Sequence, residues 1–425
     1  MTSEPRRSTH KRLALLAAAV LVAVLVAVLA SAVVVPDPGL EADTSGKPDS
    51  PHCLPVAGSA RPTGPTPSVC SPHGISGSDA PALGAYVGYD IRGVKRIKEF
   101  STWLGGAKVR VGHTYLPGDL WSNIEGRRDF LDVWAEWRRA EDDRVFVLNV
   151  PLMEQNEADL PDSKVRDLLR QAAGGAFDRH FRTLAKNLVA LGVPDTILVL
   201  GWEMNGITYT HRCGPNPKHW KAYWRRIVTA MRSVPGQRFM FEFAPNRGVD
   251  DIPWPKCYPG DDVVDIIGMD SYDQPNGITF DEQVSEPYGL QFHVDFAKAH
   301  GKPIAYPEWG LFRNGDNVTY MLRMLAWLDE HKPLYHTVTD YCPHGVWECS
   351  ANSRASAVYR AVVSGQYAPD PEPEPSVPST RPPTASVEPP HPTPNPTPAH
   401  PRPTGCPCRP GERFGPSGCP CTPGE

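Results

Sequence analysis

Short apolar runs recur along the middle of the chain at about the interval that a strand followed by a helix requires. We count eight between Leu83 and Tyr341: Ala85–Ile91, Ala107–Tyr115, Val145–Met153, Thr196–Asn205, Phe239–Asn246, Val264–Asp273, Pro303–Gly310 and Tyr335–Tyr341. Between many of them, apolar residues recur every three or four positions, which predicts amphipathic helices. These are clearest in Asp129–Arg139, Phe177–Leu191, Pro217–Arg232 and Val318–His331. The pattern predicts an α/β fold, a (β/α)8 TIM barrel formed by residues 83–368.

A doubly wound open sheet would produce a similar alternation of strands and helices. Such a sheet normally carries a Gly-rich phosphate-binding loop after its first strand. No such loop follows the first apolar run, so the barrel is the favoured interpretation.

The composition changes on both sides of the predicted barrel. Residues 40–82 form a Pro/Gly/Ser-rich linker, and residues 369–404 contain Pro, Thr, Ser and Glu with almost no large apolar residues. A stretch of that kind cannot bury enough surface to fold, which predicts a disordered tail. Residues 405–425 hold a tandem repeat, GCPCRPGE and GCPCTPGE, which fits a small disulfide knot or cross-linking to a wall or partner.

The N-terminal residues 1–39 carry the pattern of an export signal. Arg6, Arg7, Lys11 and Arg12 precede an apolar run from Leu13 to Val35, which includes the peptidase-like sequence Ala-Ser-Ala at 30–32. The run is closer to the length of a spanning helix than to that of most signal peptides, so cleavage and retention as a membrane anchor both stay open. Since positive charges stay on the cytosolic side, the protein is expected to be extracellular, secreted or tethered to the outer face of the cell membrane.

Ten cysteines agree with export, because outside the reducing cytosol they are expected to pair. The predicted pairs are Cys213–Cys257, Cys342–Cys349 and Cys53–Cys70. A metal site is the alternative, but the chain has no Cys-x2-Cys pair and no His-Glu-x-x-His spacing. We therefore expect no metal and no cofactor.

The net charge of −5 is mild, and no cluster of Lys and Arg is interleaved with aromatic residues. Nothing in the composition therefore indicates nucleic-acid binding. We expect a monomer that acts on a neutral polysaccharide, with the cell wall or membrane as further partners through the termini.

Polar and aromatic residues gather at the C-terminal ends of the predicted strands, where a barrel carries its active site. Any one of them alone also fits a solvated loop or a strand-end cap, so it is their gathering at one edge that indicates an active site. The members are His113, Tyr115, Glu154, Glu203, Asn205, Asn246, Asp270, Tyr272, Asp273, Glu308 and Trp309.

Two glutamates stand out in this collection. Because side chains alternate along a strand, Glu203 and Asn205 are expected on one face of the fourth run, and Tyr306 and Glu308 on one face of the seventh. Glycosidic cleavage requires two groups. One is a carboxylic acid that protonates the leaving oxygen, and the other is a carboxylate that either attacks the sugar or activates a water molecule. Different surroundings keep their pKa values apart.

Around these residues the chain resembles glycoside hydrolase family 26, a family of retaining (β/α)8 barrels that includes β-mannanases, β-1,3-xylanases and β-glucanases. The resemblance rests on four motifs in the family's order and spacing: GWEMNG (201–206), FAPN (243–246), DIIGMDSYD (265–273) and PEWG (307–310). It implies that Glu203 is the acid/base, that Glu308 is the nucleophile and that Tyr272 holds the nucleophile. Many members have histidine before the acid/base, where this chain has Trp202.

The remaining members of the site are expected to bind substrate. Trp121, Tyr115, Trp309 and Trp347 are available to stack on sugar rings, although a tryptophan in a barrel also fits core packing. Polar contacts with the sugar are expected from Asn205, Asn246, Asp270 and His113.

The sequence thus favours a retaining glycoside hydrolase that cleaves a β-linked polysaccharide of the mannan, xylan or glucan type. The alternative is a non-catalytic carbohydrate-binding cell-surface protein on the same scaffold, because a fold alone implies no activity. A serine hydrolase is disfavoured by the lack of a Gly-x-Ser-x-Gly motif.

Overall fold

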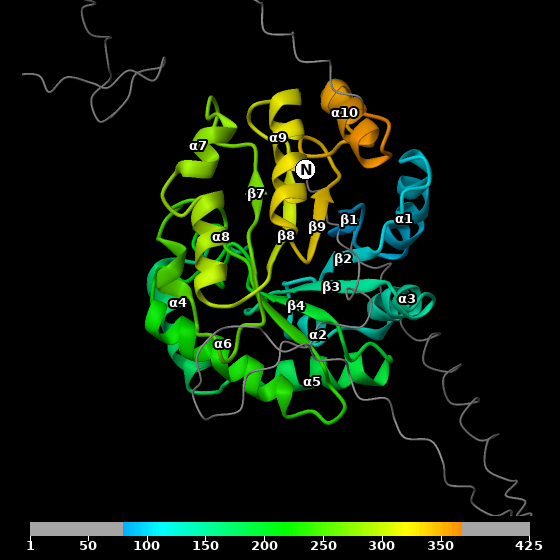
Figure 1. The fold of residues 1–425 in the computed structure, drawn as a ribbon. Coiled ribbons are helices and arrows are strands. Elements are labelled where there is room, and N and C mark those ends of the chain that lie inside the picture. Colours follow the sequence, from blue (N-terminus) through cyan, green and yellow to red (C-terminus); the bar gives the residue numbers. More distant parts are fainter. Residues whose placement is uncertain (1–79, 368–425) are drawn as a thin grey trace, which may run out of the picture. The chain divides into compact units, whose positions relative to one another are not determined.

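The computed structural model describes residues 80–367. The predicted N-terminal signal or anchor, the Cys53–Cys70 pair and the C-terminal repeat lie outside the described residues. Within them, a parallel sheet closes on itself and helices surround it (Figure 1). The strands are β1 (Ala82–Tyr86), β2 (Val111–Tyr115), β3 (Val145–Val150), β4 (Ile197–Leu200), β5 (Met240–Phe243), β6 (Ile266–Gly268), β7 (Ser271–Tyr272), β8 (Ile304–Gly310) and β9 (Tyr335–Thr339).

The strands follow one another around the ring in sequence order, and pairing of β1 with β9 and of β6 with β8 closes it. The short strands β6 and β7 both pair with β8, at Ile267↔Ile304 and Ser271↔Trp309. They are two parts of one interrupted strand in the sixth barrel position. The nine described strands therefore make an eight-stranded parallel barrel, and the predicted (β/α)8 fold is confirmed.

Helices cover the outside of the barrel (Figure 1). They are α1 (Ile91–Trp103), α2 (Trp121–Ile124), α3 (Arg128–Arg139), α4 (Asp162–Ala173), α5 (Asp178–Ala190), α6 (Pro217–Arg232), α7 (Phe280–Ser285), α8 (Leu290–Ala299), α9 (Val318–His331) and α10 (Ser353–Val363), with short 3-10 helices η1 (Trp254–Cys257) and η2 (Ser350–Asn352). The four helices that the periodicity marked most clearly are present, and the bounds of α6 and α9 agree with the prediction.

Side-chain caps fix where several helices begin. The Asn216 side chain accepts a hydrogen bond from the His219 N–H, and Pro217 follows at the first position of α6. Asn317 caps α9 in the same way through the Tyr320 N–H. Such a cap satisfies a backbone donor that has no partner within its own helix and stabilises a helix by about 1 kcal/mol.

Strand β3 separates the two parts of the hydrophobic core. Val145 and Val147 belong to the cluster inside the barrel, whereas Phe146 and Leu148 belong to the cluster between strands and helices. Phe146 stacks on Trp134 of α3 at 5.9 Å between ring centroids. Each such buried side chain contributes about 1.5–3 kcal/mol through removal of apolar surface from water.

Most of the predicted strands end at other residues than the runs did, and two of these differences bear on the site. The first strand runs from Ala82 to Tyr86 rather than from 85 to 91, because Asp90 caps helix α1, whose first residue is Ile91. The fourth strand ends at Leu200, and the chain then turns, with positive φ angles of 62° at Gly201 and 50° at Glu203. The strand alternation predicted for Glu203 and Asn205 therefore does not apply to them.

A second correction concerns β8, where the pairing with β9 is irregular between Tyr306 and Trp309. The Tyr306 hydroxyl accepts a hydrogen bond from Trp327 Nε1 of α9 at 2.7 Å and so lies on the helix side of the strand. Glu308 lies on the opposite side, in the mouth of the barrel. Tyr306 and Glu308 were predicted to share a face, and the irregular pairing separates them.

Two disulfides join loops at the C-terminal edge of the barrel, Cys213–Cys257 and Cys342–Cys349, and both were predicted. No helix within residues 80–367 is both long and apolar enough to cross a membrane.

Candidate active site

A cavity of about 760 Å³ opens at the C-terminal ends of the strands. Its walls come from the loops after β1, β2, β3, β4 and β9, and Glu308 lies in it. A neighbouring cavity of about 510 Å³ shares the wall residues Pro117, Gly118, Asn156 and Glu157. Six aromatic residues line the larger cavity: Tyr86, Tyr89, Tyr115, Trp202, Tyr209 and Tyr341. Concave, aromatic walls with a few polar groups are typical of ligand sites.

Glu308 is held by groups from three other strands. The Tyr272 hydroxyl donates to Glu308 Oε2 at 2.8 Å, and Asn149 Nδ2 donates to Oε1 at 3.1 Å. Tyr115 also forms a hydrogen bond with this carboxyl group. Burial raises the pKa of Glu308, while these three hydrogen bonds favour the ionised form and oppose the rise. Glu308 is therefore arranged as an oriented carboxylate.

Glu203 lies in a different environment. Its backbone N–H donates to the Ala244 carbonyl at 2.9 Å, which fixes the turn after β4. The φ angle of 50° is unusual for a residue other than glycine, and such conformations cluster at functional sites. Among residues 80–367, no side chain or backbone group donates a hydrogen bond to its carboxyl group. Burial, followed by the charges of Glu308 and Asp250, raises the pKa of Glu203 to about 8.

The hydrogen bonds and charges around the two glutamates thus differ, although both side chains are partly shielded from water. Hydrogen-bond donors surround Glu308. Within the described part of the chain Glu203 has no such donor, and the negative charges of Glu308 and Asp250 act on it. Near neutral pH this arrangement keeps a proton on Glu203 and favours a charge on Glu308. One group can then act as an acid while the other acts as a nucleophile or base.

Two further carboxyl groups lie inside the barrel. Glu242 of β5 is fully buried and accepts a hydrogen bond from the Tyr335 hydroxyl at 2.6 Å. Burial raises the pKa of Glu242 to about 8. Asp270, between β6 and β7, is fully buried, and neither of its carboxylate oxygens has a partner within the described residues. Burial and the charges of Glu308, Glu203 and Glu242 raise its pKa well above the usual value.

Several residues predicted to touch substrate instead support the site. His113 Nε2 lies 2.9 Å from Asn149 Oδ1 and so orients the amide that donates to Glu308. Burial lowers the pKa of His113 to about 4, so the ring is neutral at ordinary pH. Asn205 exchanges two hydrogen bonds with the Asn246 backbone, at 2.9 and 2.8 Å, and joins the loops after β4 and β5. The prediction that they bind sugar directly is corrected for His113 and Asn205, because both are fully buried.

Three predicted stacking residues lie away from the cavity. Trp309 is fully buried on the helix side of β8, where its Nε1 donates to His336 Nδ1 at 3.2 Å. Trp121 of α2 stacks on His180 of α5 at 4.2 Å between centroids. Trp347 packs against Phe100 of α1. All three serve packing, the alternative that the sequence had left open, while Tyr115 does line the cavity.

Other residues of the site were not predicted. Tyr86 is the last residue of β1, Asn149 is the last but one of β3, and Tyr341 follows β9, all at the same edge as the predicted members. The strand-end rule, applied to these three strands, would have selected them. Tyr89 and Tyr209 lie in loops, where the periodicity of the sequence gives no signal. Trp202, noted as a departure from the family, lines the cavity with its edge against Tyr115 and Tyr209.

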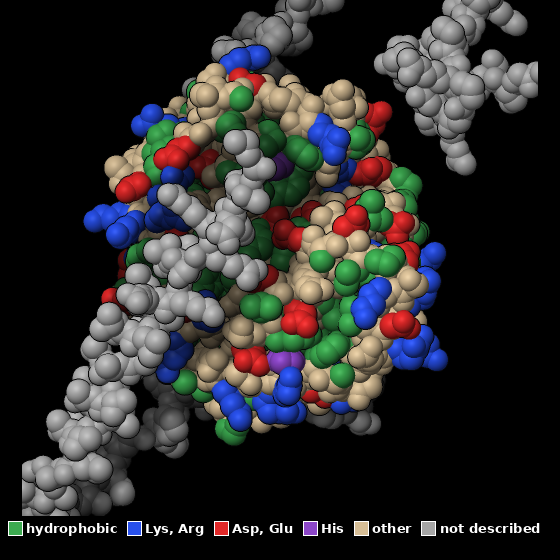
Figure 2. Space-filling model, turned by 180° about the vertical axis from the view of Figure 1, so that it is seen from behind, with side chains coloured by type: hydrophobic (Ala, Val, Ile, Leu, Met, Phe, Trp, Pro, Cys, Tyr) green, Lys and Arg blue, Asp and Glu red, His purple; other side chains and the backbone are tan. Residues whose placement is uncertain are grey.

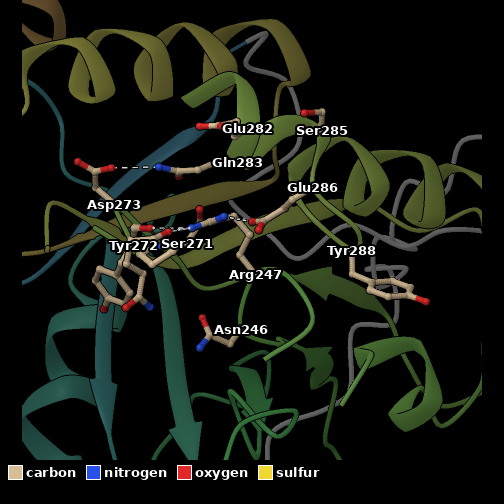
Figure 3. Close-up of polar contacts among 12 residues, drawn as sticks. Asn246, Arg247, Ser271, Tyr272, Asp273, Glu282, Gln283, Ser285, Glu286 and Tyr288 are labelled. Carbon is tan, nitrogen blue, oxygen red and sulfur yellow. Dashed lines mark hydrogen bonds and ion pairs between the residues drawn. The ribbon is translucent and has the colours of Figure 1, made fainter. Parts of the chain in front are cut away.

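A buried arginine braces the loops behind Tyr272 (Figure 3). Arg247 forms an ion pair with Glu286 and donates from Nη2 to the Tyr272 carbonyl at 3.2 Å and to the Gln274 carbonyl. Next to it, Gln283 donates to Asp273 at 3.0 Å. Asp273, which was predicted at the site by its strand-end position, therefore belongs to the hydrogen-bond network of these loops. The network fixes the backbone that carries the tyrosine hydroxyl to Glu308.

Charged groups of both signs are mixed on the surface of the barrel. Lys and Arg side chains are interspersed with Asp and Glu over the face that Figure 2 shows. Within residues 80–367, no cluster of three or more His, Cys, Asp or Glu side chains is arranged to hold a metal ion.

Comparisons with known proteins agree with this geometry. Residues 183–312 match the profile of glycosyl hydrolase family 26, which confirms the predicted resemblance over a segment that contains Glu203, Tyr272 and Glu308. No curated protein sequence matches the chain.

Solved structures share the fold at low sequence identity. The mannanase BCman from Bacillus subtilis has a TM-score of 0.50 and 16% identity, over 67% of this chain and 86% of the other. An endo-beta-1,4-mannanase double mutant from Cellulomonas fimi has a TM-score of 0.48 and 18% identity, over 61% and 65%. The family match, with the barrel, supports a glycoside hydrolase that acts on a β-linked polysaccharide.

Proposed function

We propose, from the match of residues 183–312 to glycosyl hydrolase family 26 and from two glutamates close enough to interact electrostatically, that this protein is a retaining glycoside hydrolase. Its substrate is a neutral β-linked polysaccharide of the mannan, xylan or glucan type. The observation that carries the proposal is the contrast between Glu308, which accepts hydrogen bonds from Tyr272 and Asn149, and Glu203, which accepts none within the described residues. The enzyme acts outside the cell, secreted or tethered by the N-terminal apolar segment.

In the first step, the Glu308 carboxylate attacks the anomeric carbon of the sugar. The bond from that carbon to the glycosidic oxygen breaks, and Glu203 gives its proton to the departing oxygen. A raised pKa suits Glu203 for this role, because the acid must hold its proton until the transition state. The product is a covalent glycosyl-enzyme ester and a shortened polysaccharide chain.

In the second step, Glu203 is ionised and takes a proton from water. The resulting hydroxide equivalent attacks the anomeric carbon, and the ester bond to Glu308 breaks. Two displacements at the same carbon retain its configuration. The hydrogen bonds from Tyr272 and Asn149 stabilise the carboxylate that leaves in this step.

The test is product analysis on mannan, xylan, mixed-linkage glucan and bacterial wall polysaccharides, with proton NMR of the first product. We expect hydrolysis of one polysaccharide class with a β-anomeric product formed first. An α-anomer formed first would exclude double displacement, and binding without hydrolysis of any class would favour the non-catalytic carbohydrate-binding alternative.

A further inference from the structure

We propose that His211 is a positioning residue for Glu203, the acid/base of the proposed mechanism. Its side chain holds the peptide bond between Trp202 and Glu203 in the orientation that sets where the Glu203 carboxyl group points. This inference rests on the proposed hydrolase function. It assigns a role in proton transfer to a buried histidine that lies outside the four motifs of the family resemblance.

His211 lies in the loop between β4 and α6 and is fully buried. Its ring nitrogen Nε2 donates to the Trp202 carbonyl at 2.9 Å, and Nδ1 accepts from the Leu152 backbone N–H at 3.5 Å. These two partners require the neutral tautomer that carries its proton on Nε2. Burial lowers the pKa of His211 to about 4, so the ring is neutral at ordinary pH.

The peptide bond between Trp202 and Glu203 is held at both of its polar groups. The carbonyl accepts from His211, and the N–H, which belongs to Glu203, donates to the Ala244 carbonyl at 2.9 Å. Rotation of this peptide plane would change the φ angle of Glu203 directly. The two hydrogen bonds therefore fix the φ of 50° at Glu203. A residue other than glycine keeps such a conformation only when its surroundings require it.

A second hydrogen bond from the same loop holds the other side of Glu203. The Cys213 N–H donates to the Met204 carbonyl at 2.7 Å. The loop is itself attached to α6, because Trp220 Nε1 donates to the His211 carbonyl at 2.7 Å. The turn that carries Glu203 is thus bound on both sides by residues 211–213.

The orientation of the Glu203 carboxyl group matters for proton transfer. An acid must lie about 2.6–3.2 Å from the oxygen that it protonates, and a displacement of about 1 Å can lower a rate on the order of 100-fold. Glu308 is oriented by hydrogen bonds to its own side chain from Tyr272 and Asn149. Glu203 accepts none within the described residues, so its position depends on the backbone that carries it. Loss of the His211 bond should therefore displace Glu203 and leave Glu308 in place.

The test separates reactions that need the proton of Glu203 from reactions that do not. It uses two aryl β-glycosides with the same glycone, taken from the manno, gluco or xylo series according to the polysaccharide that the wild-type protein hydrolyses. One carries dinitrophenol, an acidic phenol that leaves without a proton, and the other carries unsubstituted phenol, which needs one. The readout is the ratio of kcat/KM for the phenyl glycoside to kcat/KM for the dinitrophenyl glycoside.

His211→Asn and His211→Gln form a matched pair. The Asn side chain reaches only as far as Nδ1, so it can accept from the Leu152 N–H but cannot donate to the Trp202 carbonyl. The longer Gln side chain brings an amide N–H near the position of Nε2 and can keep the bond to Trp202. In His211→Asn the ratio should fall on the order of tenfold or more, while kcat/KM for the dinitrophenyl glycoside stays within about threefold of the wild-type value. His211→Gln should restore most of the ratio.

His293→Phe is the control for loss of a buried histidine, and it is compared with His211→Phe. His293 is also fully buried and donates from Nε2 to the Ile267 carbonyl at 2.8 Å, but its partners are Ile267 and Tyr306 rather than the turn at Glu203. His293→Phe should keep the wild-type ratio, and His211→Phe should lower it as His211→Asn does. Because Phe keeps the volume of the ring, His211→Phe keeps the test valid should His211→Asn fail to fold.

Thermal unfolding identifies the variants that are folded. An unchanged ratio in folded His211→Asn or His211→Phe would overturn the positioning role, because a purely structural defect lowers kcat/KM for both glycosides by the same factor. No hydrolysis by the wild-type protein of either glycoside or of the polysaccharide panel would instead overturn the proposed function.

Discussion

The different surroundings of Glu203 and Glu308 give two residues of the same type different chemical roles. A carboxyl group without hydrogen-bond donors, near other negative charges, keeps its proton, and one that accepts several donors is easier to ionise. Glu203 has the first environment and Glu308 the second. The raised pKa of about 8 for Glu203 also predicts that kcat/KM declines above that pH.

Substitution of each glutamate should separate the two roles. Glu308→Ala removes the nucleophile and should abolish turnover of every substrate. Glu203→Ala should keep first-step activity on an aryl glycoside whose phenol is acidic, because that leaving group needs no proton. Added azide should restore turnover and give a β-glycosyl azide, identified by NMR. An α-glycosyl azide from Glu203→Ala would assign the roles differently.

Tyr272→Phe should change the pH dependence of catalysis. The Tyr272 hydroxyl donates to Glu308, and this hydrogen bond favours the carboxylate. Its loss raises the pKa of Glu308, so the acidic limb of the kcat/KM profile should move to higher pH, with activity at the optimum reduced about tenfold. Tyr320→Phe is the matched control, because its buried hydroxyl donates to the Ser271 carbonyl and does not touch Glu308. The proposed role of Tyr272 fails if both variants keep the wild-type acidic limb.

Glu242→Gln should make stability less dependent on pH. Burial raises the folded-state pKa of Glu242 from the ordinary value of 4.5 to about 8. The neutral form therefore contributes stability that is present below pH 4.5 and lost as pH rises through about 8. As the pH rises through this window, the free energy of unfolding of the variant should increase relative to that of the wild-type protein by up to about 1.4 kcal/mol per pH unit. Urea unfolding at several pH values measures the difference, and a constant difference would contradict the prediction.

At the scale of strands and helices, hydrophobic periodicity was informative where an element has one buried face. The bounds of α6 and α9 followed from it because Asn216 and Asn317 cap helices with a regular apolar stripe. Strand ends were less predictable. The turn at Glu203 and the irregular pairing before Glu308 both depend on contacts between distant segments, such as the hydrogen bond from the Glu203 N–H to Ala244. The residues next to these positions in the sequence do not predict those contacts.

The same limit applied to the walls of the site. Glu203, Glu308 and Tyr272 were selected by motif, whereas Trp309 and Trp347 were selected only as aromatic residues at or near strand ends. Which side of β8 Trp309 occupies is set by the irregular pairing with β9. Tyr341 and Arg96 come from separate elements that meet only in the closed barrel.

Loss of the Cys213–Cys257 disulfide should affect both stability and catalysis. The bond joins the loop after β4 to η1 after β5, across 44 residues. Constraint of the unfolded chain predicts a loss of about 2–4 kcal/mol in the double variant Cys213→Ala/Cys257→Ala. The Cys213 N–H also donates to the Met204 carbonyl, next to Glu203, so kcat should fall as well. Thermal unfolding and kinetics of the double variant test this, with Cys342→Ala/Cys349→Ala as the matched control for disulfide loss.

At the scale of the whole molecule, the barrel gathers residues that are far apart in the chain. Glu308 contacts Asn149 and Tyr272, which precede it by 159 and 36 residues. Closure of the ring between β1 and β9 brings Tyr86 to within 6.2 Å of Tyr341, measured between ring centroids. The site therefore requires the complete ring of strands, and no single supersecondary unit carries it.

Removal of the residues after Pro369 should leave catalysis nearly unchanged. Every group assigned to the site lies between Tyr86 and Trp347, and the last described helix, α10, ends at Val363. The removed segment has a composition that cannot form a packed core, with many Pro residues and few large apolar ones. On a soluble polysaccharide, kcat/KM of the truncated protein should stay within about twofold of the full-length value, since a segment without a packed core adds little stability. Near-complete loss of turnover in a truncated protein with an intact thermal transition would show that the tail completes the site. On an insoluble wall preparation the same pair of proteins tests a second role of the tail. If the tail binds the wall, its removal should lower activity there and leave the soluble assay unchanged.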